Sequence, residues 1–209
     1  MNVNLKYNLL LGFLFVISFQ VIAQRSTEKW KGQLSVGINN PIESDQSAYY
    51  SGYINFPTVN LGVQHMLSES FGAKLDLGFN RSSNNNTSPE FKLNYTRVNL
   101  QAVYDFHKLF PFLPDRVTLV GHAGPGMSFS NPLGDFSENK YTFLNALGGL
   151  EVHYALSDTF SIYSDFGYVL SLSAKEKYNP AINGFSFNGD LIYLSFGISF
   201  SLSGCNYCY

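Results

Sequence analysis

A regular alternation of apolar and polar residues runs from Phe71 to Asn80. Every second residue is apolar, and the residues between them are small, polar or charged. The same pattern returns from Phe160 to Tyr168, where Ser164 alone interrupts the apolar row. Successive side chains of a strand point to opposite faces, so this period of two predicts strands that separate an apolar environment from a polar one. A soluble sandwich and a membrane barrel both fit this pattern.

The same pattern along the rest of the chain predicts eight strands, each long enough to cross a bilayer at a tilt. We expect them at Lys31–Asn39, Thr58–Met66, Phe71–Asn80, Lys92–Phe106, Val117–Phe129, Tyr141–Ala155, Phe160–Ser171 and Asp190–Leu202. Because proline cannot donate to a ladder, the fifth of these strands should bend or end near Pro125, at its outer tip.

Long and short connections alternate between the predicted strands. This is typical of outer-membrane barrels, whose long loops lie outside the cell and whose tight turns lie in the periplasm. The segment His107–Arg116 departs from the rule, because it is long for a turn and contains two prolines. We interpret it as an irregular segment against the inner membrane interface. The long polar connections are Asn40–Pro57, Arg81–Phe91, Ser130–Lys140 and Leu172–Gly189.

The N-terminus has the features of a secretory signal peptide. Lys6 supplies a positive charge, an apolar run extends from Leu9 to Phe19, and small residues precede a cleavage site after Ala23. A transmembrane anchor fits less well, because the run is shorter than the roughly 18 to 20 residues that span a bilayer. We therefore expect a signal peptide at 1–23, a barrel at 24–202 and a periplasmic tail at 203–209.

The composition favours the membrane barrel over the soluble sandwich. Charged residues make up 13% of the chain, against about 25% in typical soluble domains, and aromatic residues reach 16%. No other segment is apolar over the length of a spanning helix, and a closed barrel is then the form that satisfies every backbone group in a bilayer. Acidic residues outnumber basic ones, 15 to 13, which argues against nucleic acid as a partner.

The final predicted strand has an apolar outer row and a small, polar inner row. The stretch from Ser195 to Leu202 resembles the signal by which the barrel assembly machinery recognises a closing strand. The matching positions are Ser195, Gly197, Phe200 and Leu202, and leucine stands at the last of them where a second aromatic residue is usual.

Two other stretches, Gly62–Phe71 and Gly149–Phe160, resemble hairpins of the small OmpA/OmpX-like and PorT-like barrel domains. The Ala23-Gln24 junction is similar to that of secreted proteins of the Bacteroidetes. The resemblance implies an all-β, eight-stranded, antiparallel up-and-down transmembrane β-barrel in the bacterial outer membrane. Its implied partners are outer-membrane lipid and, during insertion, the barrel assembly machinery.

Counting by twos from the turns assigns the inner row of the predicted barrel. An eight-stranded barrel is only wide enough for its own side chains, so charges inside it have to be paired. Lys74 and Arg97 supply the cations. We predict a network centred on Arg97 with Asp76, Glu151 and Asp165, to which His122 and His153 can adapt. The expected inner row is Gln33, Ser35, Asn39, Asn60, Gln64, Lys74, Asp76, Arg97, Asn99, Gln101, His122, Asn145, Glu151, His153, Tyr163, Asp165 and Tyr193.

Acids and histidines that face a cavity could also form a hydrolase site, as in outer-membrane lipid A deacylases. A nucleophile needs a base within hydrogen-bond reach, but no His-x-Ser pair occurs, and Ser164 should face lipid on a different strand from His153. We therefore expect no catalytic residues, no metal and no cofactor, and a structural role for the lumen network. A lipid-modifying enzyme, a narrow diffusion channel and a soluble lipocalin-type barrel remain the alternatives.

Aromatic residues in the long connections suggest where a partner would bind. Asn40–Pro57 and Leu172–Gly189 both carry tyrosine and phenylalanine, which can contact an envelope protein, a surface partner or lipid headgroups. We therefore expect a non-enzymatic barrel with a filled polar lumen, whose role is structural or lies in interactions of its extracellular loops.

Cys205 and Cys208 form a lone C-x-x-C in the expected periplasmic tail. A structural zinc site needs four ligands, and the chain contains no second cysteine pair. Thioredoxin-type chemistry needs the pair at a helix N-terminus, which so short a tail does not provide. The residues favour a small disulfide loop in an oxidising compartment, or two thiols available to a partner.

Overall fold

The computed structural model describes residues 29–43, 49–114, 116–173 and 187–202. The expected signal peptide at 1–23 and the tail at 203–209, with Cys205 and Cys208, lie outside the described residues. No helix in the described part of the chain is long and apolar enough to span a bilayer.

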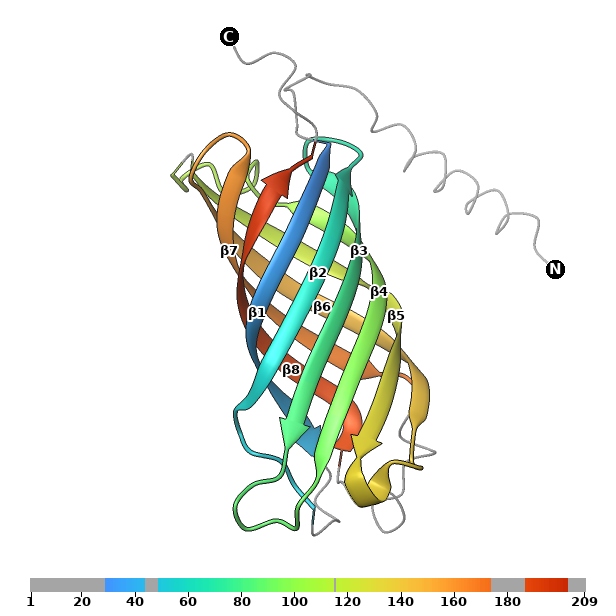
Figure 1. Ribbon diagram of the computed structural model, residues 1–209. Helices are drawn as coiled ribbons and strands as arrows, with labels where there is room; N and C mark the ends of the chain where they lie inside the picture. The colour runs from blue at the N-terminus through green and yellow to red at the C-terminus, as the bar shows by residue number, and fades with distance from the viewer. Residues whose placement is uncertain (1–28, 44–48, 115, 174–186, 203–209) are drawn as a thin grey trace, which may run out of the picture.

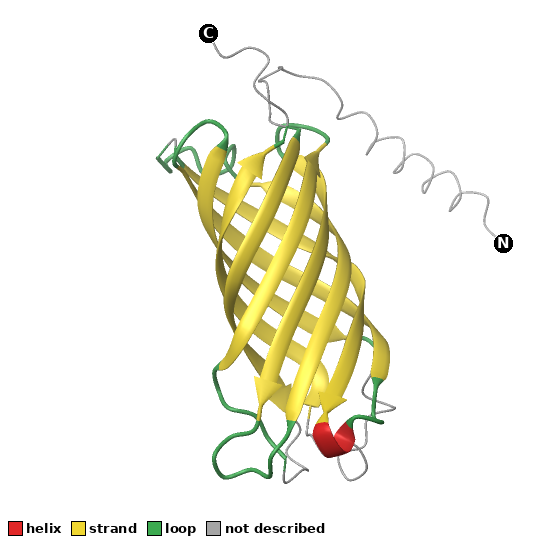
Figure 2. Ribbon diagram, viewed as in Figure 1, coloured by secondary structure: helices red, strands yellow, loops and turns green. Residues whose placement is uncertain are grey.

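Eight antiparallel strands form a closed barrel in which each strand pairs with its neighbours in the chain and β8 pairs back onto β1 (Figures 1 and 2). A single-turn 3₁₀ helix, Gly134–Phe136, follows the fifth strand. The predicted up-and-down barrel is therefore confirmed. The strands are β1 (Trp30–Glu43), β2 (Asn55–Met66), β3 (Phe71–Ser83), β4 (Lys92–Asp105), β5 (Val117–Leu133), β6 (Tyr141–Ala155), β7 (Phe160–Ser171) and β8 (Phe187–Ser201).

The two ends of the barrel differ. At the turn end, β1 begins and β8 ends beside the β2–β3 turn, because the Leu202 N–H bonds the Trp30 carbonyl and the Met66 N–H bonds the Lys29 carbonyl. The described parts of the four long polar connections lie at the opposite, loop end (Figure 1). Five strands (β1, β2, β3, β5 and β8) extend further at the loop end than the sequence predicted. The barrel wall therefore continues into segments that were expected to be loops.

Alternation along the strands gives the barrel an apolar outside and a largely polar inside. Phe71 and Leu75 on β3 are 46% and 50% exposed, whereas Lys74 and Asp76 between and beside them are buried. All the residues of the expected inner row are buried. The outer row presents large apolar side chains around the barrel, as a surface immersed in lipid requires.

β5 does not end near Pro125, as one form of the prediction had it, because the strand continues to Leu133. A bend there stays a prediction. Its ladder with β6 is unbroken through Pro125, which pairs with Ala146. Toward β4, pairing stops after Gly126 and resumes at Ala123 in the same register. Pairing with β6 therefore carries the strand past the proline, and only one of the two ladders is interrupted.

The irregular segment between β4 and β5 forms a series of hydrogen-bonded turns. The N–H groups of Leu109 and Phe110 bond the carbonyl of Phe106, and the three phenylalanines Phe106, Phe110 and Phe112 contact one another in sequence. Phe112 is 78% exposed. Its contact with the inner membrane interface stays a prediction.

Candidate functional site

The predicted charge network lies across the middle of the lumen. We call it the charge layer: Lys74, Asp76, Arg97, His122, Glu151, His153 and Asp165, all of which are buried. They come from five strands, β3 to β7. The structure therefore brings together all seven residues that the inner row predicted for the network.

Arg97 is fully enclosed in this layer. Its guanidinium forms an ion pair with Asp76, donates from Nη2 to Asn60 Oδ1 at 2.7 Å and lies 4.8 Å from the ring centroid of Tyr193. The neighbouring β3 position opposite Arg97 is Gly78, where an added Cβ would lie 2.6 Å from Arg97 Nε. A glycine is needed here because the guanidinium occupies the space of a side chain.

Glu151 forms the second centre of the layer. Its Oε1 lies 2.5 Å from Lys74 Nζ, and its Oε2 accepts from Gln33 Nε2 at 3.0 Å and lies 2.6 Å from His153 Nε2. The predicted network had Arg97 at its centre with Glu151 as a partner, and the structure differs in this respect. Lys74 reaches Glu151 across the lumen, whereas Arg97 pairs with an acid on the adjacent strand.

Asp165 meets His122 and Tyr193 in a third group. Asp165 Oδ1 lies 3.0 Å from His122 Nε2, and Tyr193 donates to Oδ2 at 3.1 Å. His122 Nδ1 lies 2.6 Å from Gln101 Oε1. Tyr193 also contacts Arg97, so this group is linked to the first centre by a shared aromatic ring.

Three side chains of this layer bring potential metal-ligand atoms close together. The ligand atoms of His122, Glu151 and Asp165 lie within 4.8 Å of one another. However, the Lys74 ammonium already lies against Glu151, and a divalent cation placed there would be repelled by it. The donor set therefore fits an internal ion-pair network better than a metal centre.

One side of the lumen at the loop end is apolar, which the expected polar inner row did not predict, whereas the buried side chains of β1 to β3 at this end are polar and include Asn39, Thr58 and Asn80. The apolar residues, which we call the aromatic layer, are Phe91, Leu93, Tyr95, Phe143, Leu147, Val169, Leu191 and Tyr193, and Tyr49, Phe136 and Tyr141 pack against them. Leu93 and Phe143 occupy the same face of their strands as Arg97 and Glu151, so their parity could have identified them.

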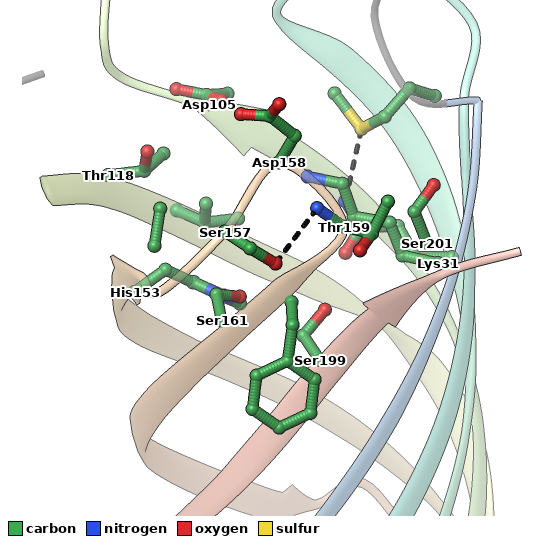
Figure 3. A pocket seen from close by; sticks show the side chains of 15 residues that line it. Lys31, Asp105, Thr118, His153, Ser157, Asp158, Thr159, Ser161, Ser199 and Ser201 are labelled. Carbon is green, nitrogen blue, oxygen red and sulfur yellow. Dashed lines mark hydrogen bonds between the residues drawn. The ribbon is translucent and has the colours of Figure 1, made fainter. Parts of the chain in front are cut away.

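A cavity of about 230 Å³ opens at the turn end (Figure 3). Hydroxyl groups of Thr118, Ser161 and Ser199 line it together with charged side chains that include Lys31 and Asp105. His153 joins the charge layer to this turn-end cavity, because it contacts Glu151 and also lines the cavity.

Ser161 was missed in the sequence search for a nucleophile. Its Oγ lies 3.4 Å from His153 Nδ1, and both residues line the cavity (Figure 3). His153 Nε2 lies against Glu151 Oε2. Because Ala155 pairs with Ser161 across the β6–β7 hairpin, hairpin register could have placed this serine near His153. The three types of side chain match a nucleophile, a base and an acid, but 3.4 Å is at the long limit for a hydrogen bond.

The residues of the expected assembly signal lie at the seam where β8 meets β1. Ser195 is buried and its Oγ lies 2.9 Å from Ser35 Oγ. A Cβ at Gly197 would contact the Leu34 carbonyl and the Ser35 side chain, so only glycine fits there. Phe200 and Leu202 are exposed on the outer face. Recognition of these residues by an assembly machinery stays a prediction.

At the loop end, the β1–β2 and β3–β4 connections are hydrogen-bonded to each other. Tyr50 N–H donates to Ser88 Oγ at 3.0 Å, and the Tyr50 and Thr87 hydroxyls are 2.5 Å apart. Asn55 Nδ2 donates to the Gly52 carbonyl at 2.6 Å, and its Oδ1 accepts from the Ser83 N–H at 3.1 Å. These bonds hold the described parts of the two connections in one arrangement.

Large apolar side chains project from this arrangement. Tyr53, Ile54 and Phe56 are 84%, 72% and 65% exposed, and we call them the loop patch. Exposed apolar side chains on a hydrogen-bonded loop are costly in water, which is why such patches usually mark contacts with a partner or a membrane.

Comparison with known proteins identifies the type of barrel. A family model described as "Outer membrane protein beta-barrel domain" matches residues 9–200. No curated protein sequence is significantly similar to the chain.

Three solved structures illustrate the shared fold. Neisserial surface protein A superposes with a TM-score of 0.60 at 12% identity, covering 83% of this chain and 97% of that one. A major outer membrane protein from Thermus thermophilus gives 0.57 at 13% identity, covering 82% and 98%. OprG from Pseudomonas aeruginosa gives 0.51 at 11% identity, covering 82% and 96%.

Proposed function

Because the chain belongs to the outer membrane protein beta-barrel domain family, and is thus a protein of the bacterial outer membrane, we propose that it is a non-conducting binding protein. It acts through its extracellular loops, and its filled lumen serves stability. With the family's orientation, the loop end faces the outside of the cell and the turn end faces the periplasm. Export through a signal peptide at 1–23 and insertion by the barrel assembly machinery complete the proposal.

The loop patch is the observation that carries this proposal. Tyr53 and Ile54 are exposed on a connection that hydrogen bonds hold in place. A preorganised loop loses little conformational entropy on binding, so exposed aromatic and aliphatic side chains on it can contribute most of their burial to affinity. The ligand is expected to be a protein of the envelope or of a contacting surface.

Two layers that close the lumen support a non-conducting barrel. The charge layer fills the middle with paired side chains. The aromatic layer fills the loop end together with the hydrogen-bonded side chains of Asn39, Thr58 and Asn80. An ion would have to displace both layers to pass, and separating a buried ion pair costs several kcal/mol. We therefore favour the role of a binding protein over that of a narrow diffusion channel.

One observation supports an enzyme, namely the contact of Ser161 with His153. Three features argue for a structural contact instead. The Ser161–His153 separation is 3.4 Å, and Glu151 is already shared with Lys74 and Gln33. The cavity is at the turn end, which faces the periplasm in the orientation proposed above. We therefore propose that the turn-end cavity is non-catalytic.

Site-specific photo-crosslinking in intact cells tests the binding role. A photoreactive residue at Tyr53 should yield one discrete protein adduct, which the same residue at Phe112 should not yield. Phe112 is a matched control because it is similarly exposed and aromatic but lies at the turn end. Adducts to lipid alone at Tyr53, or the same protein adduct at both sites, would contradict the proposal.

A further inference from the structure

A basic pair lies on the outer surface of the barrel where the lipid-facing row ends. On β3 the outward positions are apolar from Phe71 to Phe79, and the next outward residue is Arg81, which is exposed. The ten residue-to-residue steps from Phe71 to Arg81 cover about 25 Å along the barrel axis, at roughly 3.3 Å per step and a tilt of about 40°. That is the height of the apolar band of such barrels, so Arg81 lies at the level of the outer headgroups.

Lys92 on β4 supplies the second charge. Arg81 pairs with Asn94 across the ladder and Ser83 pairs with Lys92, so Arg81 and Lys92 are diagonal neighbours on the outer face. Diagonal pairs of this kind have Cα atoms roughly 7 to 8 Å apart. Lys92 is exposed. Glu90 is the nearest acid along the chain, and within the described residues no ion pair joins it to Lys92.

The Arg81 side chain is already held in place. Its Nε donates to Asn94 Oδ1 at 2.9 Å, and its Cζ lies 5.9 Å from the ring centroid of Phe79. These contacts use one of the five N–H groups and one face of the guanidinium. Among the residues that the structure describes, none accepts a hydrogen bond from the two Nη groups, so the fork that binds phosphate in a bidentate manner is available.

We infer that Arg81 and Lys92 form a binding site for a phosphate group of the outer-leaflet glycolipid. The acyl chains of such a lipid would lie along the apolar outer row below Phe79, and its phosphate would meet the two cations at the headgroup level. Arginine supplies the two-pronged hydrogen bonds and lysine supplies a mobile charge. Basic residues at a membrane surface attract anionic headgroups in this way.

At the opposite rim of the barrel, one exposed lysine already has an acidic partner. The exposed Lys108 at the turn end is paired with Glu69 at 2.6 Å and is not available to an anion. Arg81 and Lys92 have no such acidic partner in the described part of the chain. The inference needs only membrane insertion and does not depend on a protein partner at the loop patch, so failure of one proposal leaves the other standing.

Native mass spectrometry of the full chain, released from nanodiscs, provides the test. The nanodiscs would contain phosphatidylcholine with either phosphorylated or enzymatically dephosphorylated lipid A. We expect the protein to retain a phosphorylated lipid A molecule. The fraction of protein that retains this lipid should be at least about tenfold lower in the double variant Arg81→Gln/Lys92→Gln. Arg81→Lys should fall between the two, because it keeps the charge and loses the fork.

Lys29→Gln is the matched control, because it removes an exposed lysine from the turn end and should leave retention unchanged. The dephosphorylated lipid should show no difference between the original protein and the double variant. Equal retention of the phosphorylated lipid by the original protein and the double variant would overturn the inference, and so would an equal loss in Lys29→Gln. Folding of each variant is checked beforehand by its mobility before and after heating.

Discussion

Along β4, β6, β7 and β8 the two ends of the lumen differ in chemistry, although the same faces of these strands supply both. Toward the loops, Leu93 and Tyr95 of β4 and Phe143 of β6 pack as in the core of a soluble protein. Toward the turns, hydroxyls such as those of Ser161 and Ser199 border an open cavity. The charge layer separates the two. Filling of the barrel is therefore uneven, and the loop half and the middle should carry most of its stability.

Removing Arg97 should have the largest effect. Arg97→Ala leaves Asp76 as a buried charge without its partner and removes the contact with Tyr193, so the free energy of unfolding should fall by about 3–5 kcal/mol. Urea titration, followed by the heat-modifiable mobility of the folded barrel, measures this loss. The double variant Arg97→Ala/Asp76→Ala should recover part of it, because no uncompensated charge remains. An unchanged midpoint in Arg97→Ala would contradict a stabilising charge layer.

Truncating Phe143 tests the aromatic layer. Phe143→Ala removes a buried ring that contacts Tyr95 and Tyr141, and we expect a loss of about 3 kcal/mol. Planar-bilayer recordings should show no stable conductance steps in this variant, because the charge layer still closes the lumen. Conductance in Phe143→Ala would mean that the aromatic layer alone blocks the barrel.

Ser161→Ala should change least. The serine borders the open cavity and its contact with His153 is long, so stability should change by less than about 0.5 kcal/mol. We also expect that a fluorophosphonate probe, which labels activated serines, does not modify Ser161. Ser199→Ala is the matched control from the same cavity. Labelling that depends on Ser161 and His153 but not on Ser199 would favour the enzyme alternative.

Much of the barrel could be predicted from period two alone. Alternation fixed which face of β3 holds Lys74 and Asp76, and the same counting placed Arg97 and Glu151 inside. The pairing of the charges could not be predicted in this way. Lys74 and Glu151 belong to β3 and β6 and meet only across the closed lumen, so their contact depends on the barrel's diameter and stagger.

The loop half was harder to predict, because apolar residues such as Leu93 and Phe143 on the inner face blur the alternation. Their burial depends on packing against apolar residues of other strands, such as Val169 and Leu191, which meet them only in the closed barrel. The continuation of β5 past Pro125 was likewise hidden from local sequence, since it depends on pairing with β6.

The seam between β1 and β8 determines the order in which the barrel can form. Ser35 and Ser195, which bond across it, are 160 residues apart in the chain, whereas the other seven ladders join consecutive strands. Hairpins can form early at little entropic cost, but the seam must close last. Until then, two strand edges are left with unpaired N–H and C=O groups, each costing several kcal/mol in hydrocarbon. Closure of a barrel with this topology is therefore slow without assistance. An assembly factor that binds the two open strand edges until they pair would accelerate it most.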